Sequence, residues 1–361
     1  MVIEMRNKVL VWGFSNNRAG TEHVIYSIAS KLPEISFDFL CYSAPVTYSD
    51  LFSPDRNNRY FTIPIKIQRP VSYHRELKSF MRDHAGEYKS LWMNINDASN
   101  IDILKMAYRC GIPRRIVHMH NNSIPDVAVT KVFHSLNRFQ CVDMATDCWA
   151  CSDSAGAFLF RDHDYRVLPN TINPAALAFS EDDRATIRSK WGIPLGARLI
   201  GTVGRLADQK RPGFLVEMLA SLIDRGDDCY LMFVGEGPLK CELEKQAREV
   251  GVHKRIRFAG LQESVAPYLS AFDVFAFPSV FEGLGIALIE AQFNGLPCVV
   301  SDGIVDEAII SRGVVRTSCD NRGAWLSALV DASRQQVVLI DKLALKYDER
   351  AQMPEIEKLF S

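Results

Sequence analysis

Two glutamates flank a glycine-rich turn in the segment PSVFEGLGIALIEAQFNG, which begins at Pro278. Glu282 precedes the turn, and Glu290 lies eight positions later in a stretch whose pattern predicts a helix. If the whole stretch were helical, the two carboxylates would stand roughly 12 Å apart along the axis. That separation is too long for two carboxylates that share one proton, and it suits a grip on the two ends of one elongated ligand. The plainer alternative is one loop glutamate and one glutamate on a helix surface.

The turn between these glutamates offers backbone N–H groups as well. Gly283, Leu284 and Gly285 could direct their N–H groups at an anion, and the dipole of the following helix favours negative charge there. A nucleotide sugar fits the arrangement, with its sugar at Glu282, its diphosphate at the turn and its ribose at Glu290. The neighbours of Glu290 are apolar, and a carboxylate that is partly buried needs partners.

Two cations follow another apolar run in the segment GTVGRLADQK. Residues 199–203 predict a buried strand, after which Gly204 lets the backbone approach a ligand closely. Arg205 and Lys210 come next, beyond the carboxyl end of that strand, where ligands bind in open α/β sheets. Two cations at that edge suit a diphosphate, whose negative charge grows when it leaves. The alternative is a pair of ordinary surface charges.

A third turn, in the segment FVGEGP, contains Gly237 and precedes a predicted helix over residues 239–250. This turn is a candidate contact to a phosphate or a base. Lys240 stands where the third glycine of a G-x-G-x-x-G motif would be, and the sequence contains no Walker A motif. These two absences disfavour a dehydrogenase and a P-loop ATPase.

Two features of the first half are also candidate ligand contacts. Gly20 precedes a predicted helix over residues 21–32 and could present N–H groups to a phosphate. His120 follows a predicted strand over residues 115–119, and strand alternation would place it on the same side as His118. The plainer interpretation of both histidines is a structural, hydrogen-bonded role.

Short apolar runs that alternate with amphipathic stretches must position these residues. Such alternation predicts βαβ units and a parallel sheet, and the chain shows two series of them. The predicted strands are 8–14, 37–41, 90–95 and 115–119 in the first series, and 199–203, 230–234, 256–258, 274–277 and 298–301 in the second. Further helices are predicted over 213–225 and 287–294. The two series are separated at residues 166–179, where two prolines and two asparagines predict turns.

Composition limits the classes of protein to which the chain can belong. Its 361 residues are 47% hydrophobic and 24% charged, which is typical of a soluble globular protein. The formal net charge of −1 disfavours a nucleic-acid partner, because phosphate binding requires an excess of positive charge. No apolar run reaches 18 residues, so no membrane-spanning helix is predicted. The first apolar run predicts a strand rather than a signal peptide.

The cysteines favour a cytoplasmic protein without a metal site. Nine of them are scattered along the chain, most in apolar runs, as suits reduced thiols. Cys148 and Cys151 form a C-x-x-C pair, but no second pair at the spacing of a zinc site accompanies them. We therefore predict no metal ligands.

The densest basic stretch runs from residue 56 to residue 89 and holds eight Lys or Arg against three Asp or Glu. Five aromatic residues are interleaved with these charges, namely Tyr60, Phe61, Tyr73, Phe80 and Tyr88. One interpretation is a solvated surface of helix and loop. The other is a surface that contacts the inner membrane or an anionic acceptor.

Taken together, these segments resemble the retaining GT-B glycosyltransferases of family four, and among them the bacterial exopolysaccharide, capsule and O-antigen glycosyltransferases. The resemblance covers nearly the whole chain and is carried by NRAGTE, HMHNN, GTVGRLADQK, FVGEGP and FPSVFEGLGIALIEAQFNG. It implies an α/β fold of the GT-B type, in which two Rossmann-like doubly wound domains face a central cleft. Residues 1–167 would bind the acceptor and residues 168–340 the nucleotide sugar. Residues 341–361 would cross back to the N-terminal domain.

The family's motifs imply roles for the matching positions in the second half. Arg205 and Lys210 would bind the donor diphosphate. Glu282 would contact hydroxyls of the transferred sugar, Glu290 the ribose, and Leu261 the base. Backbone contacts to the diphosphate and the sugar would come from Gly283, Leu284, Gly285 and Ile286.

The same motifs imply two contacts from the first half. His120 would contact the acceptor and the sugar near its reacting carbon, so that His120 and Glu282 are the implied catalytic residues. Gly20 would lie near the diphosphate. The family often has two glycines in this loop, whereas here Ala19 precedes Gly20, and this departure bears on how closely the loop approaches the phosphate.

The resemblance also implies the reaction. A hexose-type sugar would move from a UDP-sugar to a lipid-linked glycan acceptor, in surface polysaccharide biosynthesis, with retention of configuration by front-face attack. No cofactor and no metal are expected, and the D-x-D at Asp162 and Asp164 is interpreted as a polar turn. Two alternatives keep the fold, namely a sugar-nucleotide epimerase and a non-catalytic partner subunit of a glycosyltransferase.

Overall fold

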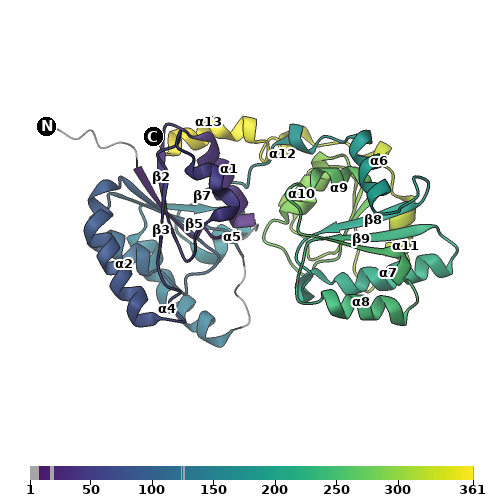
Figure 1. The fold of residues 1–361 in the computed structure, drawn as a ribbon, viewed down its shortest axis with the longest axis horizontal. Coiled ribbons are helices and arrows are strands. Elements are labelled where there is room, and N and C mark those ends of the chain that lie inside the picture. The colour runs from purple at the N-terminus through teal and green to yellow at the C-terminus, as the bar shows by residue number, and fades with distance from the viewer. Residues whose placement is uncertain (1–7, 17–19, 123, 125–126, 361) are drawn as a thin grey trace. The chain divides into compact units, whose positions relative to one another are not determined.

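Two parallel sheets organise the chain (Figure 1). The computed structural model describes residues 8–16, 20–122, 124 and 127–360. One unit contains Met1–Thr171 together with Arg350–Ser361, and the other contains Ile172–Glu349. The sequence placed these two boundaries at 167/168 and 340/341, which is four and nine residues earlier.

The N-terminal unit contains a seven-stranded sheet in the order β3-β2-β1-β4-β5-β6-β7, with every described pairing parallel. Its strands are β1 (Lys8–Trp12), β2 (Ser36–Cys41), β3 (Arg59–Thr62), β4 (Ser90–Ile95), β5 (Arg114–Met119), β6 (Asp147–Ala150) and β7 (Arg166–Val167). The sequence predicted the four central strands, because both of their faces are buried and they are therefore continuously apolar. It missed the mostly exposed edge strand β3 and the short strands β6 and β7.

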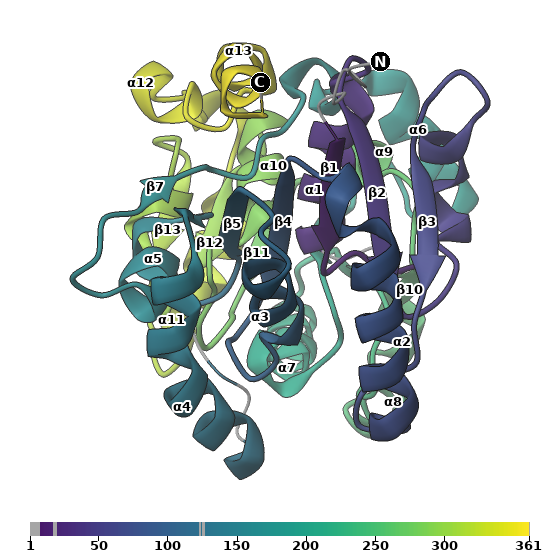
Figure 2. The same cartoon turned by 90° about the vertical axis from the view of Figure 1, so that its left-hand side faces the viewer.

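Helices cover both faces of this sheet (Figure 2). The helices of the unit are α1 (Gly20–Lys31), α2 (Pro70–His84), α3 (Asp102–Arg109), α4 (Ala128–Met144), α5 (Asp153–Leu159) and α13 (Glu349–Phe360), with 3-10 helices at Val46–Phe52 and Ala85–Glu87. Side chains of α2, α3, α4 and α5 pack with one face of the sheet, and those of α1 and α13 pack with the other.

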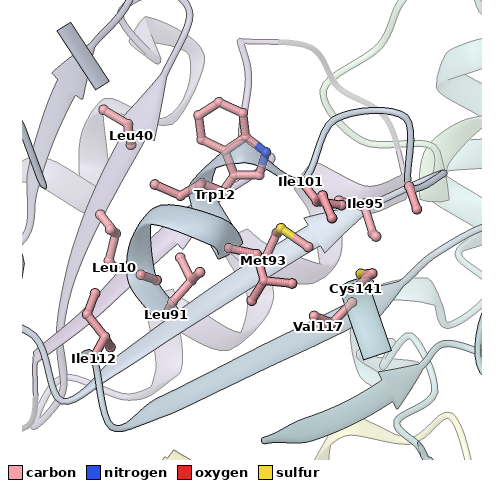
Figure 3. Packing of buried hydrophobic residues seen from close by; sticks show 14 of the residues in the cluster. Leu10, Trp12, Leu40, Leu91, Met93, Ile95, Ile101, Ile112, Val117 and Cys141 are labelled. Carbon is pink, nitrogen blue, oxygen red and sulfur yellow. The ribbon is translucent and has the colours of Figure 1, made fainter. Parts of the chain in front are cut away.

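Because successive side chains of a strand point to opposite faces of the sheet, each central strand contributes side chains to both layers. Leu10 and Trp12 of β1 pack with the first layer, whereas Val9 and Val11 pack with the second. Figure 3 shows part of the first layer, in which Leu91 and Met93 of β4 join the two β1 side chains. The packed core fixes where each strand ends, and hence where the loops that follow begin.

The C-terminal unit contains a six-stranded parallel sheet in the order β10-β9-β8-β11-β12-β13. Its strands are β8 (Arg198–Val203), β9 (Cys229–Val234), β10 (Ile256–Gly260), β11 (Val274–Phe277), β12 (Cys298–Val300) and β13 (Val314–Arg316). The sequence predicted five of the six. It missed the edge strand β13, which is half-buried or exposed throughout.

This sheet is also doubly wound. The helices are α6 (Glu181–Lys190), α7 (Pro212–Asp224), α8 (Lys240–Glu249), α9 (Ala266–Ala271), α10 (Ile286–Phe293), α11 (Arg322–Asp331) and α12 (Asp341–Ala344). The 3-10 helices lie at Pro174–Leu177, Asp208–Lys210, His253–Arg255, Asp306–Ala308 and Arg334–Gln336. Side chains of α7, α8 and α11 form one core layer, and those of α6, α9 and α10 form the other.

The helix α13 returns the chain to the N-terminal unit. Phe360 lies 5.1 Å from Trp92, 5.4 Å from Trp149 and 5.7 Å from Phe37, as measured between ring centroids. Arg114 at the start of β5 donates a hydrogen bond to the carbonyl of Leu359. These contacts make α13 part of the core of the first sheet.

Among the helices in the described part of the chain, none combines the length and the apolar composition that a membrane crossing needs.

Candidate active site

Every predicted site residue of the second half lies at one edge of the C-terminal sheet. Because β8, β9, β10 and β11 run parallel, their carboxyl ends meet at this edge. Backbone hydrogen bonds join the loops that follow. The N–H of Gly204 donates to the carbonyl of Val234 at 2.9 Å, and the N–H of Gly235 donates to that of Gly260 at 2.8 Å. The edge is thus a continuous surface of backbone turns.

Two glycines allow these turns to approach one another. A Cβ atom on Gly235 would stand 2.1 Å from the carbonyl oxygen of Gly204, and one on Gly237 would stand 2.3 Å from that of Leu206. Neither distance is compatible with a side chain. Gly237, which the sequence suggested as a ligand contact, therefore has a packing role, and its contact with a ligand stays a prediction.

Lys210 and Glu282 meet across this edge although 72 residues separate them. Lys210 Nζ lies 2.5 Å from Glu282 Oε1, and the ammonium stands 4.9 Å from the centroid of the Phe277 ring. The Glu282 side chain is buried, so the ion pair is shielded from water. The carboxylate oxygens of Glu282 can accept hydrogen bonds from sugar hydroxyls.

The backbone around this pair is joined as well. The N–H of Val280 donates to the carbonyl of Gln209 at 2.8 Å, and Gln209 Nε2 donates to the carbonyl of Phe281 at 2.8 Å. The loops after β8 and β11 are therefore fixed to each other on both sides of the ion pair. The contact of Lys210 with Glu282 belongs to this framework and does not depend on a ligand.

Arg205 differs from Lys210 in its surroundings. Its side chain is exposed, and it forms no ion pair with any residue that the structure describes. Its charge is therefore available to an anion at the end of β8. Of the two predicted cations, Lys210 is thus paired with Glu282, and Arg205 has no ion pair among the described residues.

The turn after Glu282 leads into α10 through a residue that must be glycine or strained. Gly285 has φ of +74° and caps the helix, a conformation that glycine adopts without penalty. Leu284 is buried in the core, whereas Gly283, Gly285 and Ile286 are partly exposed. The first N–H groups of α10 have no partner within the helix, so they can bind an anion. Because the helix starts only at Ile286, the separation of roughly 12 Å for a fully helical segment does not apply.

Glu290 lies on α10 and is half-buried. Its carboxylate makes no hydrogen bond or ion pair to any residue that the structure describes. Burial raises the pKa of Glu290 to about 7. A ligand hydroxyl that donated to this carboxylate would compensate for the lost water and would favour the charged form.

Leu261 lies at the far side of the same edge, after β10. Its side chain is 61% exposed, which offers an apolar surface to a flat ring. From β10 to β11 there are three strand spacings, or about 14 Å. Along the edge, the exposed Leu261 is thus followed by the unpaired cation Arg205 and then by Glu282, whose carboxylate is paired with Lys210.

In the N-terminal unit, His120 lies directly after β5 and its ring is oriented by Asn94. His120 Nε2 lies 2.8 Å from Asn94 Oδ1, and Asn94 Nδ2 donates to the carbonyl of Trp12 at 3.3 Å. Because that second bond fixes which end of the amide is the oxygen, Nε2 must carry the proton and donate. Nδ1 is then an unprotonated acceptor, buried and without a partner among the described residues. Burial lowers the pKa of His120 to about 3.

His118 is a core residue. Its ring centroid lies 4.1 Å from that of His120, so the two rings share one side of the strand, as alternation predicts. Its ring is fully buried between Trp92 and Trp149. Burial and the neighbouring His120 lower the pKa of His118 well below its usual value. The structural part of the plainer interpretation agrees with this burial, but its hydrogen-bonded part is wrong, because neither ring nitrogen of His118 has a hydrogen-bond partner among the described residues.

Gly20 is the first residue of α1 and is exposed. Ala19, where the sequence departs from the family's pattern, lies outside the described residues. Two residues further into the helix, Glu22 is buried and accepts a hydrogen bond of 2.5 Å from Ser15 Oγ.

Comparison with known proteins identifies this arrangement. The profile of the family described as glycosyl transferases group 1 matches residues 197–334, which carry all four loops of the edge. The similarity to this family thus extends over residues 197–334 of the chain.

Three relatives show how far the likeness extends. The chain is 29% identical over 309 residues to the putative glycosyltransferase EpsF of Bacillus subtilis, covering 83% of this chain and 80% of EpsF. It is 30% identical over 139 residues to the UDP-Gal:alpha-D-GlcNAc-diphosphoundecaprenol alpha-1,3-galactosyltransferase of Escherichia coli, covering 38% of this chain and 36% of that enzyme. HepE of Anabaena, solved with UDP and glucose, superimposes with a TM-score of 0.75 at 16% identity over 97% of both chains. The fold is GT-B.

Sequence reasoning missed two residues that shape the candidate site. Asn94 orients His120, and its signal was a single amide near the end of an otherwise apolar strand. Phe277 stands beneath the Lys210 ammonium, and nothing in the sequence separates it from the other core phenylalanines.

Other polar features lie away from these residues. Asp162 and Asp164, the D-x-D of the sequence, are both exposed, and no group of three or more His, Cys, Asp or Glu in the described ranges is placed to hold a metal ion. A groove of about 750 Å³ lies between α7 and α8 and includes none of the predicted site residues.

Proposed function

We propose that the chain transfers a hexose-type sugar, with retention of configuration, from a UDP-sugar to a lipid-linked glycan acceptor in surface polysaccharide biosynthesis. The match of residues 197–334 to the profile described as glycosyl transferases group 1 supports glycosyl transfer. A relative that uses UDP-galactose and a diphosphoundecaprenol acceptor, and a fold neighbour that binds UDP and glucose, support the choice of donor and acceptor.

The order of chemical groups along the edge of the C-terminal sheet carries this proposal. Leu261 follows β10, Arg205 follows β8, and Glu282 follows β11, so that base, diphosphate and sugar would lie in the order of a nucleotide sugar. Glu290 provides an unsatisfied carboxylate for the ribose. An extended donor of this class needs an apolar contact, a cation and a hydrogen-bond acceptor in this sequence.

The charges suit the bond that breaks. When the bond between the anomeric carbon and the diphosphate breaks, negative charge grows on the leaving oxygens. Arg205, Lys210 and the first N–H groups of α10 would stabilise that charge. The acceptor oxygen forms its new bond to the anomeric carbon on the same face, and its proton passes to a diphosphate oxygen. This step needs neither a metal nor a cofactor, and we propose that the reaction uses none.

In the N-terminal unit, the proposed role of His120 is to accept a hydrogen bond from a substrate rather than to donate one to it. Its unpartnered Nδ1 can accept a hydrogen bond from a hydroxyl of the sugar or of the acceptor. With a pKa of about 3, the ring stays neutral at physiological pH and cannot serve as a general acid there.

Two substitutions test the donor site, each assayed for transfer with EDTA present. Glu282→Ala and Lys210→Ala should each lower turnover of a UDP-sugar at least tenfold, because each removes one half of the pair that binds the sugar and the diphosphate. Lys245→Ala, an exposed lysine on α8, is the control and should retain activity. Turnover like that of the wild type in both site variants would contradict the assignment.

The same assay separates the alternative reactions. Interconversion of two nucleotide sugars without any acceptor would identify an epimerase. Failure to bind any nucleotide would favour a non-catalytic partner subunit.

A further inference from the structure

The crevice of the N-terminal sheet lies between β1 and β4. The strand order runs from β2 through β1 and β4 to β5, and α1 after β1 and α3 after β4 pack on opposite faces of the sheet. A sheet of this kind binds its ligands where the connections diverge in this way, outside the carboxyl ends of the strands. His120, directly after β5, flanks the crevice on one side, and the loop after β2 flanks it on the other.

Tyr42 is an exposed aromatic residue on the β2 side of the crevice. It directly follows β2 and is 40% exposed. Trp12, the last residue of β1, packs against the Tyr42 ring, with the two ring centroids 5.4 Å apart and the ring planes at 77°. Trp12 itself is buried in the first core layer (Figure 3). This edge-to-face contact with a buried ring holds Tyr42 and leaves part of it open to solvent.

Asn100, in the loop after β4, lies beside the hydroxyl of Tyr42. Burial raises the pKa of Tyr42, and the neighbouring Asn100 side chain opposes that effect. Asn100 Nδ2 also donates a hydrogen bond of 3.2 Å to the hydroxyl of the buried Tyr73. The Tyr42 ring thus has neighbours on β1 and in the loop after β4. A side chain that is ordered before its ligand arrives loses little conformational entropy on binding.

A sugar ring has the chemistry that complements Tyr42. The C–H groups on the face of a hexose are apolar and pack against an aromatic ring, whereas the hydroxyls at its rim need hydrogen-bond partners. The Tyr42 hydroxyl can both donate and accept such bonds, and so can the amide of Asn100. An aromatic surface with a few polar groups at its side is the usual composition of a small-molecule site.

Tyr42 and His120 are too far apart to contact the same sugar. From β2 to β5 there are three strand spacings, or about 14 Å, which is more than one hexose ring spans. If the sugar that reacts lies at His120, then Tyr42 contacts the next part of the acceptor. In an acceptor that carries a single sugar on a lipid diphosphate, that next part would be the diphosphate.

The charges around Tyr42 disfavour a diphosphate at this position. Lys66 Nζ lies 2.6 Å from Asp102 Oδ2, and His74 Nδ1 lies 3.8 Å from the same oxygen, so the lysine is already paired. Asp102 also raises the pKa of Tyr42, which means that its negative charge acts at the ring. A diphosphate beside Tyr42 would be repelled by that charge, whereas a neutral sugar would not.

We propose that the acceptor is an oligosaccharide whose second sugar stacks on Tyr42 while its first sugar, which receives the new bond, lies at His120. The inference rests on the proposed function, because that function places the reacting sugar at His120. Tyr42 is then a specificity-determining residue. It favours acceptors with at least two sugars over a single sugar on a diphosphate.

Saturation-transfer NMR of the full chain tests the sugar contact, with and without UDP. The probes are octyl glycosides of glucose, galactose and N-acetylglucosamine, and octyl glycosides of the disaccharides maltose, lactose and chitobiose. At least one disaccharide should bind about fivefold more tightly than its monosaccharide. Saturation should reach the C–H protons of both of its rings.

Substitutions at Tyr42 separate the aromatic ring from its hydroxyl. Tyr42→Ala should weaken binding of that disaccharide about fivefold and should remove saturation of the second ring, whereas Tyr42→Phe keeps the ring and should retain most of the affinity. The matched control is Tyr60→Ala. Tyr60 is 46% exposed and also packs edge-on against another ring, that of Phe52, at 5.2 Å. Circular dichroism checks that each variant is folded.

The kinetics of transfer give a second readout. Tyr42→Ala should raise the KM for the disaccharide about fivefold, and it should leave kcat and the KM for the UDP-sugar unchanged. A loss of stability alone would lower the amount of active enzyme and would not change the KM for one substrate selectively.

Three results would overturn the proposal. One is a panel in which no disaccharide binds more tightly than its monosaccharide. Another is binding of the disaccharide that Tyr42→Ala leaves unchanged. The third is an octyl monosaccharide diphosphate that binds as tightly as any of the disaccharides, since a diphosphate would then occupy the position beside Tyr42. Binding of a disaccharide through Tyr42 without any sugar transfer would contradict the proposed function instead, so the two failures are distinguishable.

Discussion

At the scale of single residues, some polar groups of the candidate site have a partner within the protein, and others have none among the described residues. Lys210 and Glu282 satisfy each other, whereas Arg205 and the carboxylate of Glu290 find no ionic partner in the described part of the chain. In the first unit, Asn94 satisfies one nitrogen of His120 and leaves the other without a partner. The contact between Lys210 and Glu282 holds the geometry in which both groups would also meet the proposed donor, and the unpaired groups are available to a ligand.

The tautomer of His120 gives a prediction about Asn94. Asn94→Asp would place a carboxylate beside Nε2, raise the pKa of His120, and favour a ring that is protonated on both nitrogens. The Nδ1 acceptor would then be lost at low pH, so kcat/KM should fall and should become dependent on pH between 5 and 8.

Nitrogen-15 NMR of the histidine rings measures this tautomer directly. The wild type should show an unprotonated Nδ1 throughout that pH range, and Asn94→Asp should show a titration. Asn96→Asp, an exposed position directly after β4, serves as the control. An unchanged spectrum together with an unchanged pH profile would remove Asn94 from its positioning role.

The burial of Glu290 gives a prediction about stability and pH. Its folded pKa of about 7 lies above the ordinary value of 4.5, so the folded state binds more protons between those values. The stability that Glu290 contributes is therefore complete below pH 4.5 and is lost as pH rises through 7. Glu290→Gln should remove this dependence, which amounts to about 3 kcal/mol of unfolding free energy.

Urea unfolding of the wild type and of Glu290→Gln at pH 5, 6, 7 and 8 measures this pH dependence of the unfolding free energy. The difference between variant and wild type should favour the variant increasingly toward pH 8. A difference that stays constant with pH would mean that the carboxylate is ionised throughout.

At the scale of elements, the buried parallel strands were predictable and the edges were not. Residues 90–95 and 274–277 are apolar because helices cover both faces. By contrast, β3 and β13 are edge strands with exposed residues, and their sequences resemble those of loops. The pairing of Lys210 with Glu282 could not be predicted either. It requires β8 and β11 to be neighbours, and no local pattern in a sequence specifies the order of strands.

The helix α13 shows how one element completes a core, and it gives a prediction. Phe360→Ala should lower the unfolding free energy of the N-terminal unit by about 3–5 kcal/mol, because the phenylalanine fills the space between Trp92 and Trp149. Urea unfolding followed by tryptophan fluorescence reports on those two neighbours. The exposed Lys358→Ala on the same helix should change stability by less than about 0.5 kcal/mol. Equal effects of the two substitutions would refute the anchoring role.

At the scale of the whole molecule, the proposed binding roles are divided between two units, each of which has its own hydrophobic core. Nearly all the residues that we assign to the donor belong to Ile172–Glu349, whereas Gly20 and His120 belong to the other unit. Binding of a nucleotide should therefore stabilise the C-terminal unit.

A thermal-shift panel of UDP, GDP, ADP and dTDP tests this expectation. UDP at a hundred times its Kd should raise the melting temperature of the transition that it stabilises by roughly 5–10 °C. The other three nucleotides should raise it less, and Arg205→Ala should abolish the effect of UDP. A shift with GDP alone would change the proposed donor, and no shift with any nucleotide would contradict a donor site in the free protein.

The return of the chain through α13 has a consequence for biosynthesis on the ribosome. The N-terminal unit cannot close its core until residues 350–361 have been made, and the whole C-terminal unit is translated before them. At bacterial or eukaryotic elongation rates, those intervening 178 residues take roughly ten to forty seconds. During that interval Phe37, Trp92 and Trp149 lack the side chain that covers them. The nascent chain therefore presents an aromatic surface to chaperones for as long as the second unit is being translated.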